Sequence, residues 1–267
     1  MKRVFIAVMA LFATPAMAQQ DAPDLCSDRP GLNTSPCTIA PHQLQLELGL
    51  GDWTLDRQGG QRQDSIAAGD ILLRYGIGGG TEIRLGWTAY GHVRTRDRLT
   101  GAIDRAGGVG DMTIGLKQML VEPASDGGGL ALALLPQISL PTGSRDIGDG
   151  DWGASLILPA SYTLGDGLSL ALSPEIDAAV NESGSGRHLA FGTAVGMEIG
   201  LGEAVSLTPE LHFLRDREPG HAVTESRAAL SFAVQPVKAT QFDIQAVAGL
   251  NHDTPDVQLS FGFTRAF

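Results

Sequence analysis

Charged and polar side chains occupy every second position in many short stretches of this sequence. Glu82 and Arg84 are one example, and Glu175 and Asp177 are another. Groups of both charges at this spacing could pair with one another, or they could line a water-filled path and act on the charge of a passing solute. The candidate lining residues are Glu47, Asp70, Arg74, Glu82, Arg84, Asp111, Lys117, Gln137, Glu175, Asp177, Glu198, Glu210, His212, Arg227, Asp243 and Gln245.

Histidine and serine residues form no catalytic pattern. A hydrolytic site would need a serine and a histidine oriented by a third residue, but His212 lies at a polar position, and Ser183-Gly-Ser185-Gly186 lacks the G-x-S-x-G elbow. The acids Asp146, Asp149 and Asp151 lack the terminal glutamate of a calcium loop, which leaves only weak cation binding as an alternative there. We therefore expect no catalytic residue, no metal site and no cofactor.

The alternation itself predicts β-strands, because successive side chains of a strand point to opposite faces. From Gln43 to Gly51, leucine fills each even position up to Leu50, while glutamine or glutamate fills the odd positions up to Glu47. Such a pattern cannot form one face of a helix. The same reading predicts twelve strands: 43–51, 70–76, 82–89, 111–117, 130–140, 152–162, 168–176, 189–201, 205–213, 228–234, 242–250 and 257–267.

An even number of antiparallel strands can close on itself and leave no edge. After the first 18 residues, no stretch approaches the ~20 apolar residues that a membrane helix requires, so a membrane-spanning chain would have to be a barrel. A lysine or arginine facing lipid near the midplane costs about 2–4 kcal/mol, so the polar positions must face inward. We predict an all-β fold, a twelve-stranded antiparallel transmembrane barrel over residues 42–267.

The connections between the predicted strands are alternately short and long. Those on the side of the chain termini include 165–167 and 202–203, whereas 52–65 and 91–108 on the opposite side are long and charged. Outer-membrane barrels have short periplasmic turns and longer outer loops. We therefore predict that the termini face the periplasm and that 52–65 and 91–108 are outer loops. A soluble β-sandwich would give no reason for this separation.

The amino terminus predicts export. Lys2 and Arg3 precede an apolar run, and Ala16-Met-Ala18 offers small residues for cleavage, so residues 1–18 read as a signal peptide. Residues 19–41 would then form a periplasmic lead-in ahead of the barrel. In that oxidising compartment we expect a disulfide between Cys26 and Cys37, with two free thiols as the alternative.

The chain is acidic. Its formal net charge is −11, and it becomes −13 when Lys2 and Arg3 leave with the signal peptide. Nucleic acid is therefore not expected as a partner, because phosphate groups need cations to neutralise them. The acidic excess favours cations or neutral solutes over anions in any pore.

Several motifs resemble known outer-membrane proteins. The terminal stretch 259–267 is similar to the closing strand of bacterial outer-membrane barrels, whose terminal Phe (here Phe267) is recognised by the assembly machinery, although Arg265 departs from the usual aromatic. Asp28-Arg-Pro-Gly31, Gly110-Asp-Met-Thr-Ile-Gly-Leu-Lys117 and Leu140-Pro-Thr-Gly143 resemble the family of outer-membrane proteins of the meta-pathway of phenol degradation. The resemblance covers nearly the whole mature chain. It implies an outer-membrane transporter with aromatic compounds as cargo.

These observations together predict a channel in the outer membrane of a Gram-negative bacterium. We expect passive passage of small hydrophobic or aromatic molecules, with no enzymatic step. The expected partners are outer-membrane lipid, the barrel assembly machinery and the solutes themselves. A structural or interaction barrel with a plugged lumen is the second interpretation, because mixed charges can also form an ion-pair network, and a lipid-modifying enzyme of the outer membrane is the third.

Overall fold

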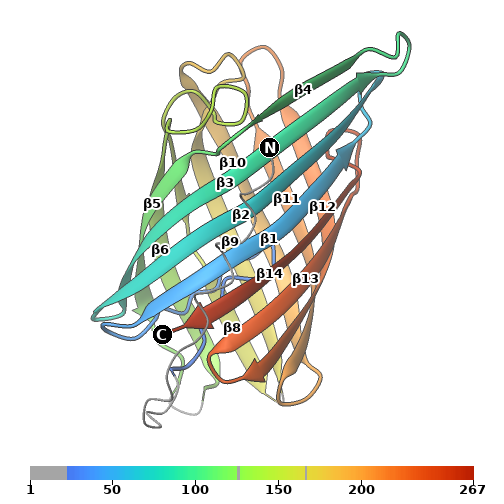
Figure 1. Cartoon of the computed structure of the whole chain (residues 1–267). Coiled ribbons are helices and arrows are strands. Elements are labelled where there is room, and N and C mark those ends of the chain that lie inside the picture. The colour runs from blue at the N-terminus through green and yellow to red at the C-terminus, as the bar shows by residue number, and fades with distance from the viewer. Residues whose placement is uncertain (1–22, 125–126, 166) are drawn as a thin grey trace, which may run out of the picture.

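Alternating sequence becomes strand throughout the described part of the chain. The computed structural model describes residues 23–124, 127–165 and 167–267. Within them the strands form a closed antiparallel barrel (Figure 1). They are β1 (Leu44–Asp56), β2 (Gln61–Gly78), β3 (Thr81–Asp97), β4 (Ile103–Gly108), β5 (Met112–Val121), β6 (Gly129–Leu140), β7 (Gly153–Ile157), β8 (Ala160–Gly165), β9 (Leu168–Val180), β10 (Arg187–Gly200), β11 (Val205–Asp216), β12 (Val223–Val237), β13 (Thr240–Gly249) and β14 (Val257–Ala266).

Two pairs of consecutive strands each share one strand position in the wall, because the strand is interrupted partway along. β4 and β5 both pair with β3, and β7 and β8 both bridge β6 and β9. The second interruption falls at Pro159, which has no N–H to give to a ladder. When each interrupted pair is counted as one strand, the wall has twelve strands, and β14 pairs with β1 to close the ring. The predicted twelve-stranded barrel is confirmed, and the predicted signal peptide lies outside the described residues.

Alternate side chains of each strand face the outside and the lumen. On β1, the outward Leu44 and Leu50 are 40% and 44% exposed, whereas the inward Gln45 and Glu47 are 0% and 1% exposed. An apolar exterior around a polar interior is the reverse of a soluble protein and fits a wall surrounded by lipid. The chain is therefore an outer-membrane barrel. Among the described residues, no helix is long and apolar enough to cross a membrane.

Two segments that the sequence predicts as outer loops are largely strand. β1 continues to Asp56 and β2 begins at Gln61, while β3 continues to Asp97 and β4 returns from Ile103. Figure 1 shows β3 and β4 running side by side to a hairpin that projects at the upper right of the barrel. Segments 52–65 and 91–108 are therefore mostly hairpin arms, and the prediction of loops there was wrong.

A β-bulge explains why the alternation of the sequence does not predict these arms. Leu48 of β1 is opposite Phe263 of β14, but Gly51 is opposite Phe261, so one extra residue is inserted in β1. On β2, Gly69 has a φ of 66° at the same level. A β-bulge of this kind reverses which residues face outward. Above it, the outward positions continue as Trp53 on β1, not as the even residues that face outward below.

Candidate functional site

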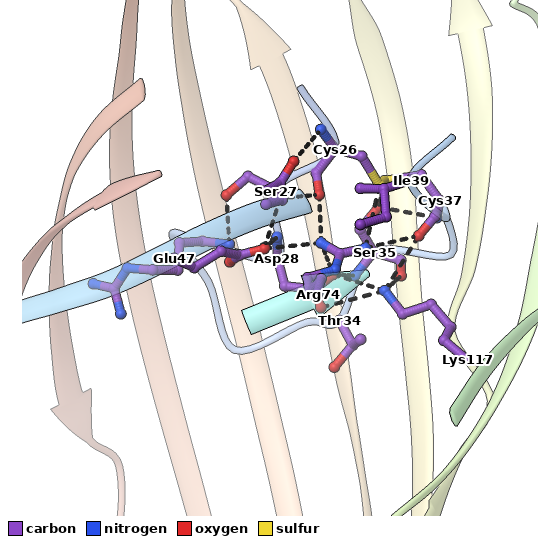
Figure 2. Close-up of polar contacts among 12 residues, drawn as sticks. Cys26, Ser27, Asp28, Thr34, Ser35, Cys37, Ile39, Glu47, Arg74 and Lys117 are labelled. Carbon is purple, nitrogen blue, oxygen red and sulfur yellow. Dashed lines mark hydrogen bonds and ion pairs between the residues drawn. A yellow bond between two sulfur atoms is a disulfide. The ribbon is translucent and has the colours of Figure 1, made fainter. Parts of the chain in front are cut away.

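The lead-in segment, residues 23–41, runs inside the barrel. The sequence places it on the periplasmic side ahead of the first strand, and the structure corrects this position. Its residues bond to lumen-facing side chains on strands all around the wall, and Cys26 and Cys37 are joined by a disulfide with a Cα–Cα distance of 6.0 Å. Figure 2 shows this bridged loop beside β1 and β2. The segment re-enters the wall at the periplasmic rim, where the His42 N–H donates to the Gly76 carbonyl (2.8 Å).

Asp28 is the centre of the contact between the lead-in and one side of the wall. Its carboxylate lies 2.7 Å from the Arg84 guanidinium and 3.0 Å from Lys117 Nζ, with Arg74 at 3.7 Å. The Ser35 N–H donates to the same carboxylate (3.0 Å). The Asp28 side chain is 9% exposed and Lys117 is fully buried. Buried charges persist only when they are paired and hydrogen-bonded, so this carboxylate and the three cations depend on one another.

Arg74 forms a second layer of the same network. It contacts Glu47 and Glu82 of the neighbouring strands at 2.8 Å each, and it donates to the Cys37 carbonyl at 3.1 Å. It also donates to the Cys26 carbonyl (Figure 2). One arginine thus holds both ends of the disulfide loop. The two carboxylates that pair with it are completely or almost completely buried.

Arg29 extends from the lead-in to the closing side of the wall. Its guanidinium contacts the Asp243 carboxylate on β13 at 3.0 Å. It also lies over Gly49 and Gly262, which face each other across the β1–β14 pair; a Cβ at Gly262 would be 2.3 Å from the guanidinium. Only glycine leaves room there for the arginine. The two glycines therefore form a notch that receives Arg29.

A third set of contacts fixes the tip of the lead-in. Glu210 of β11 accepts hydrogen bonds from the backbone N–H groups of Leu32 (2.9 Å) and Asn33 (3.0 Å). Ser173 of β9 accepts from the Thr34 N–H (3.0 Å) and donates to the Thr34 carbonyl (3.1 Å). The segment therefore bridges the lumen in its periplasmic half, where these strands begin.

The outer half of the lumen is covered by the connection between β6 and β7. Asp111 accepts hydrogen bonds from the N–H groups of Gly143 (2.6 Å) and Asp149 (2.7 Å), which draws this loop inward. Ile147 packs against Gly91, where a Cβ would overlap it. Burial and the neighbouring Asp111 carboxylate raise the pKa of Asp149 above its usual range. The Asp111 carboxylate thus holds the loop in place, and Asp149 of the loop adds a second carboxylate beside it.

The remaining predicted lining residues lie in the outer half or along the far wall. His212 Nε2 is 3.1 Å from Glu175, and Asp70 accepts a hydrogen bond from Thr88 (3.1 Å). Arg227 contacts Glu225 of its own strand. The others line internal cavities: Gln137, Asp177, Glu198 and Gln245.

Among the cavities lined by the described residues, five follow one another along the lumen. Two outer ones of about 390 and 280 Å³ share Thr113, Ser139 and Asp149. A cavity of about 250 Å³ shares Asp52 with the first of them. It shares Arg29 with a cavity of about 390 Å³ between the lead-in and the wall of β8–β13, which continues into one of about 170 Å³ at the periplasmic turn. Arg29 thus lies between the outer and the periplasmic cavities.

Sequence reasoning did not identify the residues that the lead-in contributes. Asp28 and Arg29 carry its buried ionic contacts with the wall, yet neither lies in a stretch that alternates. Both belong to Asp28-Arg-Pro-Gly31, the motif that carried the family resemblance. That motif was the available signal. The exposed Phe267 pairs with Leu44 through its N–H (2.8 Å), and its role as an assembly signal stays a prediction.

Solved structures with a similar fold include outer-membrane channels, porins and an autotransporter translocator domain from Neisseria meningitidis. An outer membrane channel from Pseudomonas putida F1 matches with a TM-score of 0.67 and 13% sequence identity, over 86% of this chain and 97% of that one. The NanC porin matches with a TM-score of 0.53 and 7% identity, over 83% and 98%. The KdgM porin, solved with disordered oligogalacturonate, matches with a TM-score of 0.50 and 7% identity, over 84% and 99%. At these identities the likeness shows the fold.

Comparison by sequence gives a more specific result. Among curated proteins, no sequence matches this chain. A family model does match it, over residues 27–267, which include the Asp28 motif, Cys37 and the whole barrel. The chain therefore belongs to the family described as the MetA-pathway of phenol degradation.

Proposed function

We propose that this barrel lets small hydrophobic or aromatic molecules cross the outer membrane passively, with no chemical step. The observation that carries the proposal is the series of cavities that follow one another from the outer loop to the periplasmic turn, each sharing lining residues with the next. A barrel that served only as a scaffold would have no need of such a series.

The proposed route passes the lead-in on the side away from Arg84 and Lys117. On one side, Asp28 of the lead-in faces the cations of β2, β3 and β5. The cavity on the opposite side is lined by Arg29, Glu198 and Glu210 together with short hydroxyl side chains, among them Ser161, Thr163 and Ser169. Hydroxyl groups bind a passing solute weakly, and conduction requires binding weak enough for release. Arg29 borders the cavities on both sides of the lead-in, and we propose that it controls passage.

The cargo class rests on the family. Its description connects it to phenol degradation, which supports aromatic molecules as the solutes. The lumen itself supports small size: each cavity measures about 390 Å³ or less, near the low end of the volume of sites for drug-sized ligands.

A second candidate is a structural barrel whose lumen is plugged. It is favoured by the number of buried ion pairs that hold the lead-in in place, since such a network could be a permanent closure. Solute uptake distinguishes the two functions. We expect liposomes containing the protein to take up phenol faster than empty liposomes and to exclude large oligosaccharides, and planar bilayers to show single-channel currents.

Uptake no faster than in empty liposomes, together with silent bilayers, would establish the plugged barrel. Incubation of the same protein with phospholipid vesicles tests the non-enzymatic part of the proposal. We expect no fatty acid to be released, and release that depends on His212 would support the lipid-modifying enzyme instead.

A further inference from the structure

Four arginines gather on one face of the hairpin arms that rise above the outer rim. Arg62 of β2 is directly opposite Arg96 of β3, and Arg94 of β3 is directly opposite Arg105 of β4. Residues paired across strands point to the same face, and so do residues two apart on one strand. Arg62, Arg94, Arg96 and Arg105 therefore share a face, which we call the arginine face.

The arginine face points away from the barrel axis. Gly91 of β3 contacts Ile147, which belongs to the loop drawn into the lumen, so the odd positions of this part of β3 face inward. The even positions, including Arg94, face outward. Tyr90 agrees with this assignment, because it lies at an even position at the base of the arm and is 50% exposed. The bulge beside Gly51 explains why these even positions face outward although the even positions lower on β3 face the lumen.

Positive charge on the arginine face is only partly neutralised. Asp64 is paired with Arg62 at 2.9 Å and lies 3.8 Å from Arg94. In the described part of the chain, Arg96 and Arg105 form no ion pair and both are exposed. Four guanidinium groups thus face outward around one carboxylate. Like charges directly opposite each other destabilise a sheet, so a bound anion would relieve this repulsion.

The height of the arginine face matches the level of lipid head groups. Trp87 and Tyr90 lie just below it on the outer surface, and exposed Trp and Tyr side chains sit at the membrane–water interface. Arg94 is four residues further along the same strand, about 13 Å at the usual ~3.3 Å per residue, and less when measured along the membrane normal because barrel strands tilt. The arginines therefore begin where the hydrocarbon ends.

We infer that the arginine face binds the phosphate groups of the phosphorylated glycolipid, lipid A, that forms the outer leaflet around the barrel. Guanidinium groups match phosphate oxygens in two-point hydrogen bonds, and clusters of Arg next to a membrane segment bind anionic head groups. Because the face looks sideways toward the membrane and not into the lumen, the ligand is a surrounding lipid and not a transported solute. The binding site is separate from the proposed route of passage.

The test compares lipid binding by two double variants of the full-length barrel in detergent. Arg96→Gln/Arg105→Gln removes the two charges of the face that lack a carboxylate partner. Arg145→Gln/Lys238→Gln removes the same net charge from the inward loop and from the periplasmic rim. Native mass spectrometry would count lipid A with two phosphates on each protein, and a heat-dependent shift in gel mobility would verify that each variant is folded.

We expect the first variant to bind lipid A at least about tenfold more weakly than the unmodified protein, and the second to bind it equally well. Lipid A with a single phosphate should bind with intermediate strength, and inorganic phosphate at the same phosphate concentration should not displace it. Equal binding by the Arg96/Arg105 variant, or an equal loss in the control variant, would overturn the inference. Displacement by inorganic phosphate as effective as by lipid would overturn the assignment to a head group.

Discussion

Arg29 is the residue on which the proposed route depends. It leaves the lead-in, enters the notch made by Gly49 and Gly262, and pairs with Asp243, and it borders both the outer and the periplasmic cavities. A single side chain in this position changes the width of the route without forming part of the wall.

Shortening this side chain should widen the route. In Arg29→Ala, the outer and periplasmic cavities lose the group between them, and we expect a single-channel conductance at least about twice that of the unmodified protein, measured in planar bilayers. Arg29→Lys keeps a charge near Asp243 and serves as the control, with a smaller change. An unchanged conductance in Arg29→Ala would show that the limiting width lies elsewhere.

Asp28 should contribute much more to docking of the lead-in than an exposed acid of the same segment. Asp28→Asn leaves Arg84 and Lys117 buried without their carboxylate, a change that typically costs about 3 kcal/mol or more. Amide hydrogen exchange of the lead-in should then become about 100-fold faster, as followed by mass spectrometry.

The matched control is Asp24→Asn. Asp24 belongs to the same segment but pairs with Lys238 while 90% exposed, and such pairs contribute about 1 kcal/mol or less. Its exchange should therefore change little. Equal acceleration in the two variants would contradict the central role of the buried carboxylate.

At the scale of elements, the loop between β6 and β7 should respond to pH. The pKa of Asp149 is raised by burial and by Asp111, so ionised Asp149 opposes the inward position of the loop. The loop should dock more firmly as the pH falls from neutral through this raised pKa, because protonation removes the unfavourable charge. Current fluctuations in planar bilayers should accordingly decrease on acidification.

Asp149→Asn should remove that pH dependence and give quiet currents at both pH values. Asp146→Asn removes the same charge from the same loop and is the control: both residues are exposed, but it is Asp149 whose N–H bonds to Asp111. Fluctuations that still depend on pH in Asp149→Asn would assign the effect to another group.

The strands and the lead-in differ in how far the sequence predicts them. Alternation has one physical cause: a wall between lipid and a polar lumen needs apolar side chains on one face and polar side chains on the other. It therefore predicts all twelve strands of the wall. It fails at insertions: the extra residue beside Gly51 reverses the faces, and the arms beyond it, which carry Arg62 and Arg94, were interpreted as loops. The lead-in has no periodicity at all, and its partners are as distant as Lys117, 89 residues from Asp28, so its position inside the lumen could not be predicted.

At the scale of the whole molecule, the charged side chains of the lumen differ between its periplasmic and outer halves. In the periplasmic half, the lumen cations Arg74, Arg84 and Lys117 all contact the lead-in. The outer half carries acids, among them Asp70 and Asp177, with Arg227 already paired to a glutamate. A solute arriving from outside therefore first meets a negative field.

This division predicts selectivity for cations over anions among ions small enough to pass. The reversal potential in a KCl gradient should have the sign of a cation-selective pore, and Asp70→Asn/Asp177→Asn should move it toward zero. Asp97→Asn/Asp104→Asn removes the same charge from the exposed hairpin arm and should leave the potential unchanged. A reversal potential of the opposite sign would refute the predicted selectivity.

The place where the lead-in docks has a consequence for how the ring is completed. Ser27 bonds to Thr264 on β14 (2.9 Å), Cys26 and Asp28 bond to Gln45 and Glu47 on β1, and Arg29 rests on the two glycines that face each other across these strands. The segment thus straddles the seam between the beginning and the end of the barrel. Because part of its binding surface forms only when β1 pairs with β14, we expect the segment to settle into the lumen after the ring has closed.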